Sequence, residues 1–184
     1  MNSKKIYQRK CLNKKCKKKF TPVLPNQVVC SGLCGIEYAK SVNVKSWAKE
    51  KKERKEKLKS RTDHLNDLQA VFNTFIRLRD QGKDCISCGR PLRGKYDAGH
   101  FYSVGAYPAL RFEELNNHGQ CVHCNRDKHG NITEYAIRLP ERIGAENFAL
   151  LLDRRKLELK LSLPEILDLK SFYKNKIKEL KISG

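Results

Sequence analysis

Eight cysteines, grouped into four closely spaced pairs, constrain the fold of this chain more than any other feature. The pairs are Cys11-x4-Cys16, Cys30-x3-Cys34, Cys85-x2-Cys88 and Cys121-x2-Cys124. The first residues contain lysines and no apolar stretch, so we expect no secretory signal and a cytoplasmic location. Thiols stay reduced in that compartment, and cysteine pairs there usually bind metal and do not form disulfides.

The third and fourth pairs have the spacing of a zinc site. Two intervening residues let both thiolates of a pair face one tetrahedral ion, and two such pairs complete a four-sulfur site. Such a site has no open coordination position, so we expect a structural zinc that joins residues 85–88 to residues 121–124 and contributes to folding. Ordinary buried thiols are the alternative. A redox pair is disfavoured, because there are two pairs and no βαβ pattern surrounds them.

The first and second pairs have looser spacing, which still falls within the range of zinc ribbons. We expect a second structural zinc in a ribbon-like module over residues 1–39. The first pair carries five lysines, which a bound zinc would hold toward a phosphate backbone: Lys14, Lys15, Lys17, Lys18 and Lys19. The alternative is a zinc scaffold whose lysines only keep it solvated.

Positive charge is concentrated in the first third of the chain. The formal net charge is +19, and residues 1–61 hold 19 Lys and Arg against 4 acidic residues, whereas residues 62–184 hold 20 against 16. Such a block gains free energy by releasing counterions on a polyanion, which indicates a nucleic-acid partner. A membrane is disfavoured, because residues 40–62 are predicted to form a basic helix without an apolar face and no run of about 18 apolar residues occurs.

Two further stretches have helical periodicity. From about Asp63, apolar residues recur every three or four positions, which predicts an amphipathic helix ending before Gly82. Residues 135–184 are also predicted to be helical, with a capping box at Ser162 and Glu165. The face of the last helix that is predicted to be buried comprises Ile166, Leu167, Phe172, Tyr173, Ile177 and Leu180. Together, the cysteine spacing, the charge distribution and the helical patterns predict an α+β protein. Its four predicted parts are residues 1–39, 40–62, 63–134 and 135–184.

Polar residues between and after the last two cysteine pairs resemble the HNH, or ββα-metal, nuclease motif. In that motif a histidine ends the first strand, an asparagine lies on the loop before the second pair, and a histidine or asparagine opens the following helix. His100, Asn116 and Asn125 occupy these places. The resemblance covers about residues 84–131 and implies a small zinc-knuckle nuclease core with flanking helices.

The chemistry of phosphodiester hydrolysis suits these side chains. A histidine that titrates near neutrality can take the proton of the attacking water, a role that fits His100. Asp97 and Asn125 offer oxygen ligands for Mg²⁺, which would stabilise the leaving group. Asn116 is expected to hydrogen-bond across the loop and orient His100, and Lys128 to reach the phosphate. The alternative is that His100 is an ordinary packed side chain.

One residue departs from the motif. The family usually has an acidic ligand directly before the histidine, where this chain has Gly99. Asp97 lies three positions before His100 and would face the opposite side of a regular strand, so we expect a bulge or tight turn at residues 98–99 to bring it round. Otherwise a nitrogen ligand is expected from another histidine: His118, His123 or His129.

The chain as a whole resembles the NinG (Rap) recombination endonucleases of lambdoid phages. The match covers about residues 9–180 and includes the cysteines, the lysine-rich helix and the segments CISCG (85–89), DAGHFYS (97–103), LRF (110–112), NNHGQCVHCN (116–125) and K-x-GN (128–131). The resemblance implies structure-specific cleavage of branched recombination intermediates, such as Holliday junctions and D-loops, during phage recombination. It also implies that DAGH is this family's own form of the motif.

Several partners and one competing function follow from this interpretation. The predicted core has no base-reading helix, so contacts of the basic segment with several DNA arms are expected to give the preference for branched DNA. Symmetric junction cleavage would call for a homodimer, which the C-terminal helices could form, and other recombination proteins are further candidate partners.

The competing function is a non-catalytic, zinc-dependent DNA-binding recombination accessory protein. A sequence-specific transcription factor is disfavoured, because no Cys₂His₂ finger pattern is present.

Overall fold

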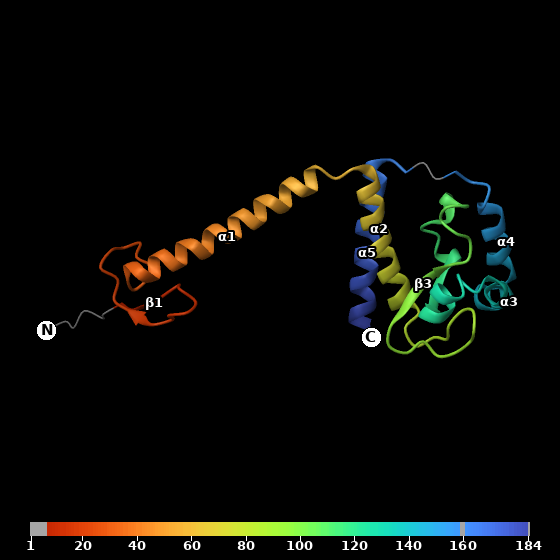
Figure 1. The fold of residues 1–184 in the computed structure, drawn as a ribbon, viewed down its shortest axis with the longest axis horizontal. Helices are drawn as coiled ribbons and strands as arrows, with labels where there is room; N and C mark the ends of the chain where they lie inside the picture. The colour runs from red at the N-terminus through yellow and green to blue at the C-terminus, as the bar shows by residue number, and fades with distance from the viewer. Residues whose placement is uncertain (1–6, 159–160, 184) are drawn as a thin grey trace. The chain divides into compact units, whose positions relative to one another are not determined.

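The fold is taken from a computed structural model of the chain, which describes residues 7–158 and 161–183 (Figure 1). The chain forms two compact units, residues 1–59 and residues 60–184. Each unit contains two of the four cysteine pairs. Helices and short sheets occur together, which confirms the predicted α+β class. Within the described residues, no helix is both long enough and apolar enough to cross a membrane.

The first unit consists of a small cysteine-rich module and one long helix. Strands β1 (Arg9–Lys10) and β2 (Lys19–Phe20) pair antiparallel and enclose the first cysteine pair. Helix α1 (Gly32–Lys57) begins within the second pair, where the hydroxyl of Ser31 accepts a hydrogen bond from the backbone N–H of Cys34. The basic helix therefore starts well before residue 40.

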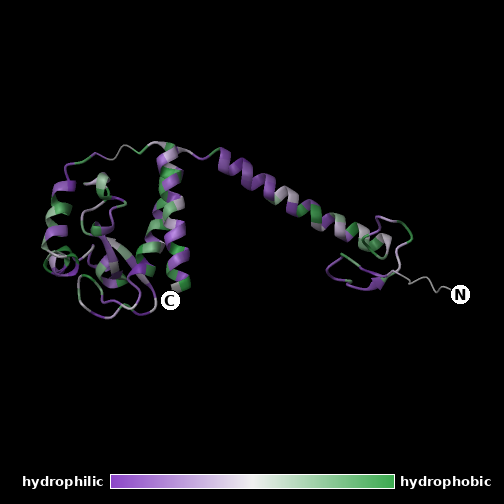
Figure 2. Cartoon of the chain, turned by 180° about the vertical axis from the view of Figure 1, so that it is seen from behind, coloured by the Kyte–Doolittle hydropathy of each residue, from purple (hydrophilic) through white to green (hydrophobic). Residues whose placement is uncertain are grey.

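Helix α1 buries none of its residues. Figure 2 shows that its C-terminal half is almost entirely hydrophilic, whereas apolar residues occur among the polar ones in its N-terminal half. Two i,i+4 ion pairs lie along it, Lys49 with Glu53 and Glu50 with Arg54, and each such pair stabilises a helix by only about 0.3–0.5 kcal/mol. The surface of α1 is thus free for contacts other than packing within the first unit.

The second unit contains the predicted amphipathic helix, α2 (Arg61–Arg79). Ser60 and Asp63 form a capping box at its start, and its apolar face is buried against α5 (Leu163–Ser183), which lies alongside it (Figure 1). Phe72 of α2 is fully buried and contacts the ring of Tyr173 of α5 edge to face. The periodicity of both stretches therefore predicted their helices correctly.

The buried face of α5 is narrower than predicted. Its capping box is present, because Glu165 accepts hydrogen bonds from the hydroxyl and the backbone N–H of Ser162. Ile166 and Tyr173 are buried, but three of the predicted core residues are substantially exposed: Leu167, Phe172 and Leu180. The prediction was wrong for these three, because α2 covers only one side of α5 and an isolated sequence does not show how much of a helix its neighbour covers.

A two-stranded hairpin and a helical turn lie at the centre of the second unit. Strand β3 (Tyr96–His100) pairs antiparallel with β4 (Asn117–Cys121), and the short helix η3 (His123–Asp127) follows directly. The loop between the strands carries two single-turn helices, η1 (Pro108–Leu110) and η2 (Glu114–Asn116).

Helices α3 (Ile132–Ile143) and α4 (Ala145–Arg154) complete the second unit. They enclose a second core with Ile86, Leu110, Tyr135, Leu139 and Leu151. Because Ile86 and Leu110 come from the segments around the hairpin, the C-terminal helices and the hairpin share one folded unit.

Candidate functional site

The last two cysteine pairs converge at the base of the hairpin. The Sγ atoms of Cys85, Cys88, Cys121 and Cys124 all lie within 4.8 Å of one another, and the sulfurs of Cys88 and Cys121 are 3.9 Å apart. Zinc–sulfur bonds of about 2.3 Å in a tetrahedron place sulfurs about 3.8 Å apart. The geometry therefore fits a zinc ion, as predicted from the spacing.

Neighbouring groups favour the thiolate of Cys88, whereas burial raises the pKa of Cys85 and raises that of Cys124 to about 12. Burial also raises the pKa of Cys88, but hydrogen bonds from the Arg90 side chain at 3.4 Å, from the Arg90 backbone and from neighbouring cysteines together outweigh this effect and bring the pKa to about 6. Backbone N–H groups donate to sulfur at two further positions, from Cys121 to Cys85 at 3.3 Å and from Cys124 to Cys121 at 3.4 Å. Thiolates are the form that binds zinc.

The first unit contains the second cysteine cluster. Cys11, Cys16, Cys30 and Cys34 also lie with their sulfurs within 4.8 Å of one another, at 3.6 Å for Cys16 and Cys30 and 3.7 Å for Cys30 and Cys34. The Ser31 hydroxyl and then Asn13 lower the pKa of Cys34 to about 7. This cluster could hold zinc as well, and the five lysines on its first pair are all exposed.

His100 stands at the end of β3 in a defined orientation. Its Nε2 atom lies 3.2 Å from the carbonyl oxygen of Arg111. Because a carbonyl can only accept a hydrogen bond, Nε2 carries the hydrogen and Nδ1 is left as the basic nitrogen. Burial lowers the pKa of His100 and so favours the neutral ring; the hydrogen bond to the Arg111 carbonyl opposes this shift, and the nearby Arg111 guanidinium adds to it. A neutral, oriented imidazole is the form that a general base requires.

Asn116 ties together the loop between β3 and β4. Its side chain is fully buried, accepts a hydrogen bond from Tyr102 N at 2.8 Å, and donates to the carbonyl oxygens of Tyr102 at 3.0 Å and Leu110 at 3.1 Å. Leu110 directly precedes Arg111, whose carbonyl oxygen orients His100. The asparagine therefore hydrogen-bonds across the loop, as expected, next to the carbonyl group that contacts His100.

A surface hollow of about 450 Å³ lies next to His100. Its walls include the two tyrosines of the loop, Tyr102 and Tyr107, and two polar residues of the following turn, Asn125 and His129. Of the three histidines considered as alternative ligands, His129 is thus the one at this hollow.

The other two histidines have structural partners. His118 is buried, accepts from Arg79 at Nδ1 over 3.2 Å and donates from Nε2 to the Leu115 carbonyl oxygen over 3.2 Å. Burial lowers its pKa to about 4. His123 is exposed and pairs with Asp127 at 3.0 Å.

Asp97 reaches the helical turn without the expected bulge. The register of β3 with β4 is continuous from Tyr96 opposite Cys121 to His100 opposite Asn117, so the prediction of a bulge at residues 98–99 was wrong. Asp97 instead contacts η3 directly, because Asn125 and Arg126 of that helix reach the face of β3 on which Asp97 lies. Asn125 Nδ2 donates to its Oδ2 at 3.1 Å, and Arg126 donates to both carboxylate oxygens at 2.7 and 2.9 Å, which lowers the pKa of Asp97.

The Asp97 and Asn125 pair has the separation of neighbouring metal ligands. Octahedral Mg²⁺ with bonds of about 2.1 Å places adjacent oxygens about 3.0 Å apart. Rotating the Asn125 amide by half a turn would exchange its nitrogen for its oxygen at 3.1 Å from Asp97 Oδ2. Arg126 occupies the same carboxylate, and within residues 7–158 and 161–183 Asp97 belongs to no group of three or more acidic, histidine or cysteine side chains placed to hold a metal. Asp97 and Asn125 could therefore offer a cation two ligands, of which Asp97 is shared with Arg126.

Lys128 follows directly after η3 and is exposed. It does not line the hollow beside His100. Its ammonium group faces solvent, where a phosphate could approach it.

Gln120 explains the glycine at position 99. A Cβ atom on Gly99 would lie 2.1 Å from Gln120 Oε1, far inside van der Waals contact. Gln120 is fully buried and donates from Nε2 to the Ser87 hydroxyl at 2.6 Å and to the Gly130 carbonyl oxygen at 2.5 Å. The space that an acidic side chain at 99 would need is thus filled by a glutamine fixed to two neighbouring loops.

The sequence reasoning missed three residues that shape the site: Arg126, Arg111 and Asp80. Asp80 is fully buried at the end of α2 and accepts from Arg79, Lys83 and the backbone N–H of Gly119, which anchors α2 to β4. The directly adjacent Asn125 and Arg126 could have signalled a carboxylate partner. Nothing in the spacing pointed to the Arg111 carbonyl or to Asp80.

Comparison with known proteins places the chain in one family. The family model described as "Bacteriophage Lambda NinG protein" matches residues 3–182. Protein ninG of Escherichia phage lambda is 35% identical, with 96% of this chain and 95% of that protein covered, and Protein ninG of Salmonella phage P22 is 38% identical, with 76% and 78% covered. No solved structure matches the chain. A family match over almost the whole length, together with relatives of 35–38% identity, shows that the chain belongs to the NinG family.

Proposed function

We propose that this protein is a metal-dependent, structure-specific DNA endonuclease of the HNH type. Its substrates would be branched intermediates of phage DNA recombination, such as Holliday junctions and D-loops. The observation that carries the proposal is that His100, whose ring is oriented by the Arg111 carbonyl, lines the same hollow as Asn125. A cysteine cluster that could hold zinc lies at the base of the hairpin and turn that support both residues.

Each residue has a distinct part in the proposed hydrolysis. His100 would accept the proton of the attacking water at Nδ1, while the Arg111 carbonyl keeps its ring in place. Asn116 would act as a positioning residue through the loop. Asp97 and Asn125 would hold a divalent cation such as Mg²⁺, which supplies charge stabilisation at the leaving oxygen when bound.

Arg126 and Lys128 are placed to contact the substrate. Arg126 is bound to Asp97 but more than half exposed, so its guanidinium could transfer to a phosphate and leave the carboxylate to the cation. Lys128 is exposed beside the same turn. Both charges would favour a polyanion, and neither reads base identity.

Branched DNA is proposed as the substrate because positive charge is concentrated in a separate unit. Residues 1–59 hold 18 basic side chains against 4 acidic ones, so this unit could bind one part of a branched substrate while the hollow in the second unit binds another. The exposed side of α5 offers a surface for a homodimer, which would supply two active sites for symmetric cleavage. Action in the host cytoplasm and contacts with other recombination proteins belong to the same proposal.

A specific observation favours a second candidate, a zinc-dependent DNA-binding accessory protein without catalysis. Gly99 replaces the usual acidic ligand, and both oxygens of Asp97 are engaged by Arg126. Such a site would bind a cation weakly, and the zinc clusters and basic helix would then serve binding alone.

Cleavage of labelled DNA separates the two candidates. The full-length protein with measured zinc content is mixed with a four-way junction or a matched linear duplex, with and without Mg²⁺. The endonuclease is supported if the junction is cut only with Mg²⁺ and in preference to the duplex, and if the folded His100→Ala variant from the same preparation is inactive. Tight junction binding without cleavage under Mg²⁺ or Mn²⁺ would instead support the accessory protein.

A further inference from the structure

One face of α1 combines basic and apolar side chains in an unusual way. Lys40, Val44, Trp47, Lys51 and Arg54 follow one another at intervals of three or four residues, which places them on one side of the helix. Trp47 is the only tryptophan of the chain and is 77% exposed. Leaving so large an aromatic side chain exposed to water is unusual. Here the ring lies between cationic residues of its own helix face.

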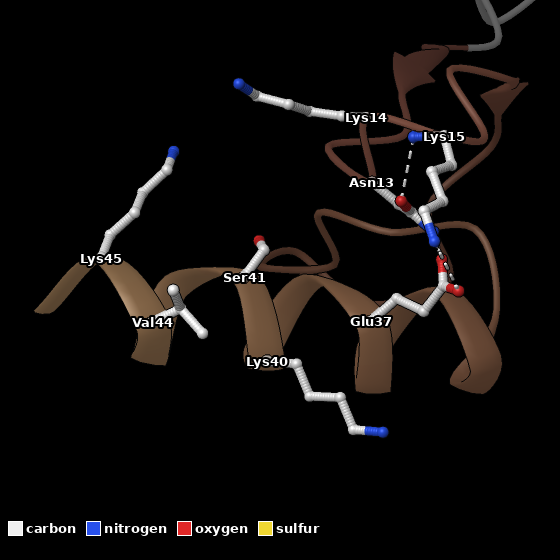
Figure 3. A pocket seen from close by; sticks show the side chains of 8 residues that line it. All are labelled: Asn13, Lys14, Lys15, Glu37, Lys40, Ser41, Val44 and Lys45. Carbon is white, nitrogen blue, oxygen red and sulfur yellow. Dashed lines mark hydrogen bonds and ion pairs between the residues drawn. The ribbon is translucent and has the colours of Figure 1, made fainter. Parts of the chain in front are cut away.

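A groove lies at the N-terminal end of the same helix. It has a volume of about 630 Å³ and runs between the loop at Asn13–Lys15 and the α1 residues from Glu37 to Lys45. Figure 3 shows Lys14 and Lys45 extending to the same side, above Ser41 and Val44, whereas Lys40 extends to the other side.

The acidic residue of the groove is already neutralised. Glu37 accepts a hydrogen bond from Asn13 Nδ2 at 2.9 Å and pairs with Lys15 at 3.7 Å. In the described part of the chain, no carboxylate lies within ion-pair distance of Lys40 or Lys51. The Trp47 face of α1 therefore presents two ammonium groups that lack an anion.

We propose that the face of α1 that carries Trp47 binds single-stranded DNA, with phosphates at Lys40 and Lys51 and an unpaired base stacked on the indole. Lys40 precedes Trp47 by two helical turns and Lys51 follows it by one, so these residues form one track along this face of α1. The groove residues Lys14 and Lys45 extend to the side of the helix opposite to Lys40 and lie outside this track. Lys51 borders the ring together with Arg54, which is paired with Glu50. Combining a basic surface with an exposed aromatic ring is how proteins bind single strands without reading sequence.

Charge and ring accessibility select this ligand over two others. A second copy packed on the same face would bring Lys40, Lys51 and Arg54 against their own counterparts, which is repulsive. Duplex DNA offers phosphates to the lysines but no exposed base face to the indole. The inference rests on the proposed function, because it takes DNA as the polyanion. It adds that the first unit binds the unpaired strand near a branch point.

Because Trp47 is the only tryptophan, intrinsic fluorescence reports directly on its surroundings. The full-length, zinc-loaded protein is titrated with an oligothymidylate, with a matched duplex and with a matched RNA strand, in a buffer without Mg²⁺. We expect the oligothymidylate to quench the emission saturably, and the duplex to bind with little quenching. Tighter binding of the RNA strand, or emission that shifts with protein concentration before any DNA is added, would overturn the proposal in favour of RNA or a second copy.

Variants of the track test the two parts of the proposal separately by the anisotropy of a labelled strand. Trp47→Leu keeps an apolar side chain but cannot stack, and should weaken single-strand binding by about fivefold to a hundredfold, whereas Trp47→Phe should keep most of the affinity. Lys40→Gln with Lys51→Gln should lower the log–log salt slope by about 1.4, because each phosphate contact on a single strand contributes about 0.7. Lys45→Gln, which removes a charge from the other side of the helix, should change the affinity far less.

These results do not depend on catalysis. Equal single-strand affinity in Trp47→Leu and wild type would contradict the proposed track, even if the protein cleaves junctions. Strong quenching by single strands in a protein that never cleaves would support the track and contradict only the endonuclease proposal.

Discussion

Replacing Asn116 by alanine should release the loop that orients His100. The side chain is fully buried and makes three hydrogen bonds, with Tyr102 N, Tyr102 O and Leu110 O. The alanine would leave these backbone groups without a partner, and each unsatisfied buried group costs about 1–3 kcal/mol. Partial access of water should reduce the sum, so we expect the second unit to lose roughly 3–5 kcal/mol of stability.

Asn117 supplies a matched control. It is also fully buried, but its side chain makes one hydrogen bond, to the Glu113 carbonyl oxygen at 2.9 Å, and its Oδ1 atom has no partner. Asn117→Ala should therefore cost only about 1–2 kcal/mol. The same substitution at two neighbouring positions separates the effect of loop hydrogen bonds from the effect of lost volume.

Hydrogen exchange measures the effect locally, which matters because Trp47 lies in the other unit and reports nothing about this loop. The Tyr102 amide donates to Asn116 Oδ1, so it should lose protection in Asn116→Ala and keep it in Asn117→Ala. Urea unfolding followed by circular dichroism gives the global change. Equal costs for the two variants, together with a protected Tyr102 amide in Asn116→Ala, would refute the role assigned to Asn116.

Three further predictions follow from the second unit and its cysteine cluster. Gly99→Asp restores the usual motif but should destabilise the protein by roughly 1–3 kcal/mol without raising cleavage, because the new Cβ would meet Gln120 Oε1 at 2.1 Å; a stable variant with higher activity would contradict this. Burial lowers the pKa of His118 to about 4 in the folded protein, so as the pH drops the unfolded chain binds a proton at this histidine before the folded protein does. The free energy of unfolding should therefore fall by about 3 kcal/mol between pH 6.5 and pH 4. In urea unfolding, His118→Gln should lack this part of the pH dependence, and an unchanged pH dependence in the variant would speak against it. Cys124→Ser should lower the zinc content and unfold the second unit, as followed by circular dichroism. Cys16→Ser should also lower the zinc content but leave residues 60–184 folded. Unfolding of both units by either substitution would show that the units do not fold separately.

The sequence predicted the features that depend on short-range spacing. The cysteine pairs converge as expected, because two-residue knuckles constrain their own geometry. The helix containing Leu65, Leu68 and Phe72 was predicted from a period that reports directly on a buried face. The loop-crossing hydrogen bonds of Asn116 also match the expectation that came from the motif.

Features that depend on register or on a neighbouring element could not be predicted. Asp97 approaches Asn125 on a regular strand, and only the pairing of β3 with β4 shows that no bulge is needed. Gln120 fills the space at Gly99 because the two lie on adjacent strands, although 21 positions separate them in the sequence. The exposure of Phe172 on α5 likewise depends on how much of that helix α2 covers.

The rate of DNA cleavage under single-turnover conditions tests the central claim most directly. Wild type, His100→Ala and His123→Ala are compared with the four-way junction at saturating protein and Mg²⁺, after equal zinc content and junction affinity have been verified. His123 is the matched control, because it is an exposed histidine of the neighbouring turn that pairs with Asp127 and does not line the hollow. A general base at His100 predicts a rate lower by roughly 10²- to 10⁴-fold in His100→Ala and an unchanged rate in His123→Ala. Equal rates in wild type and His100→Ala would contradict the assignment of His100 and of the hollow beside it.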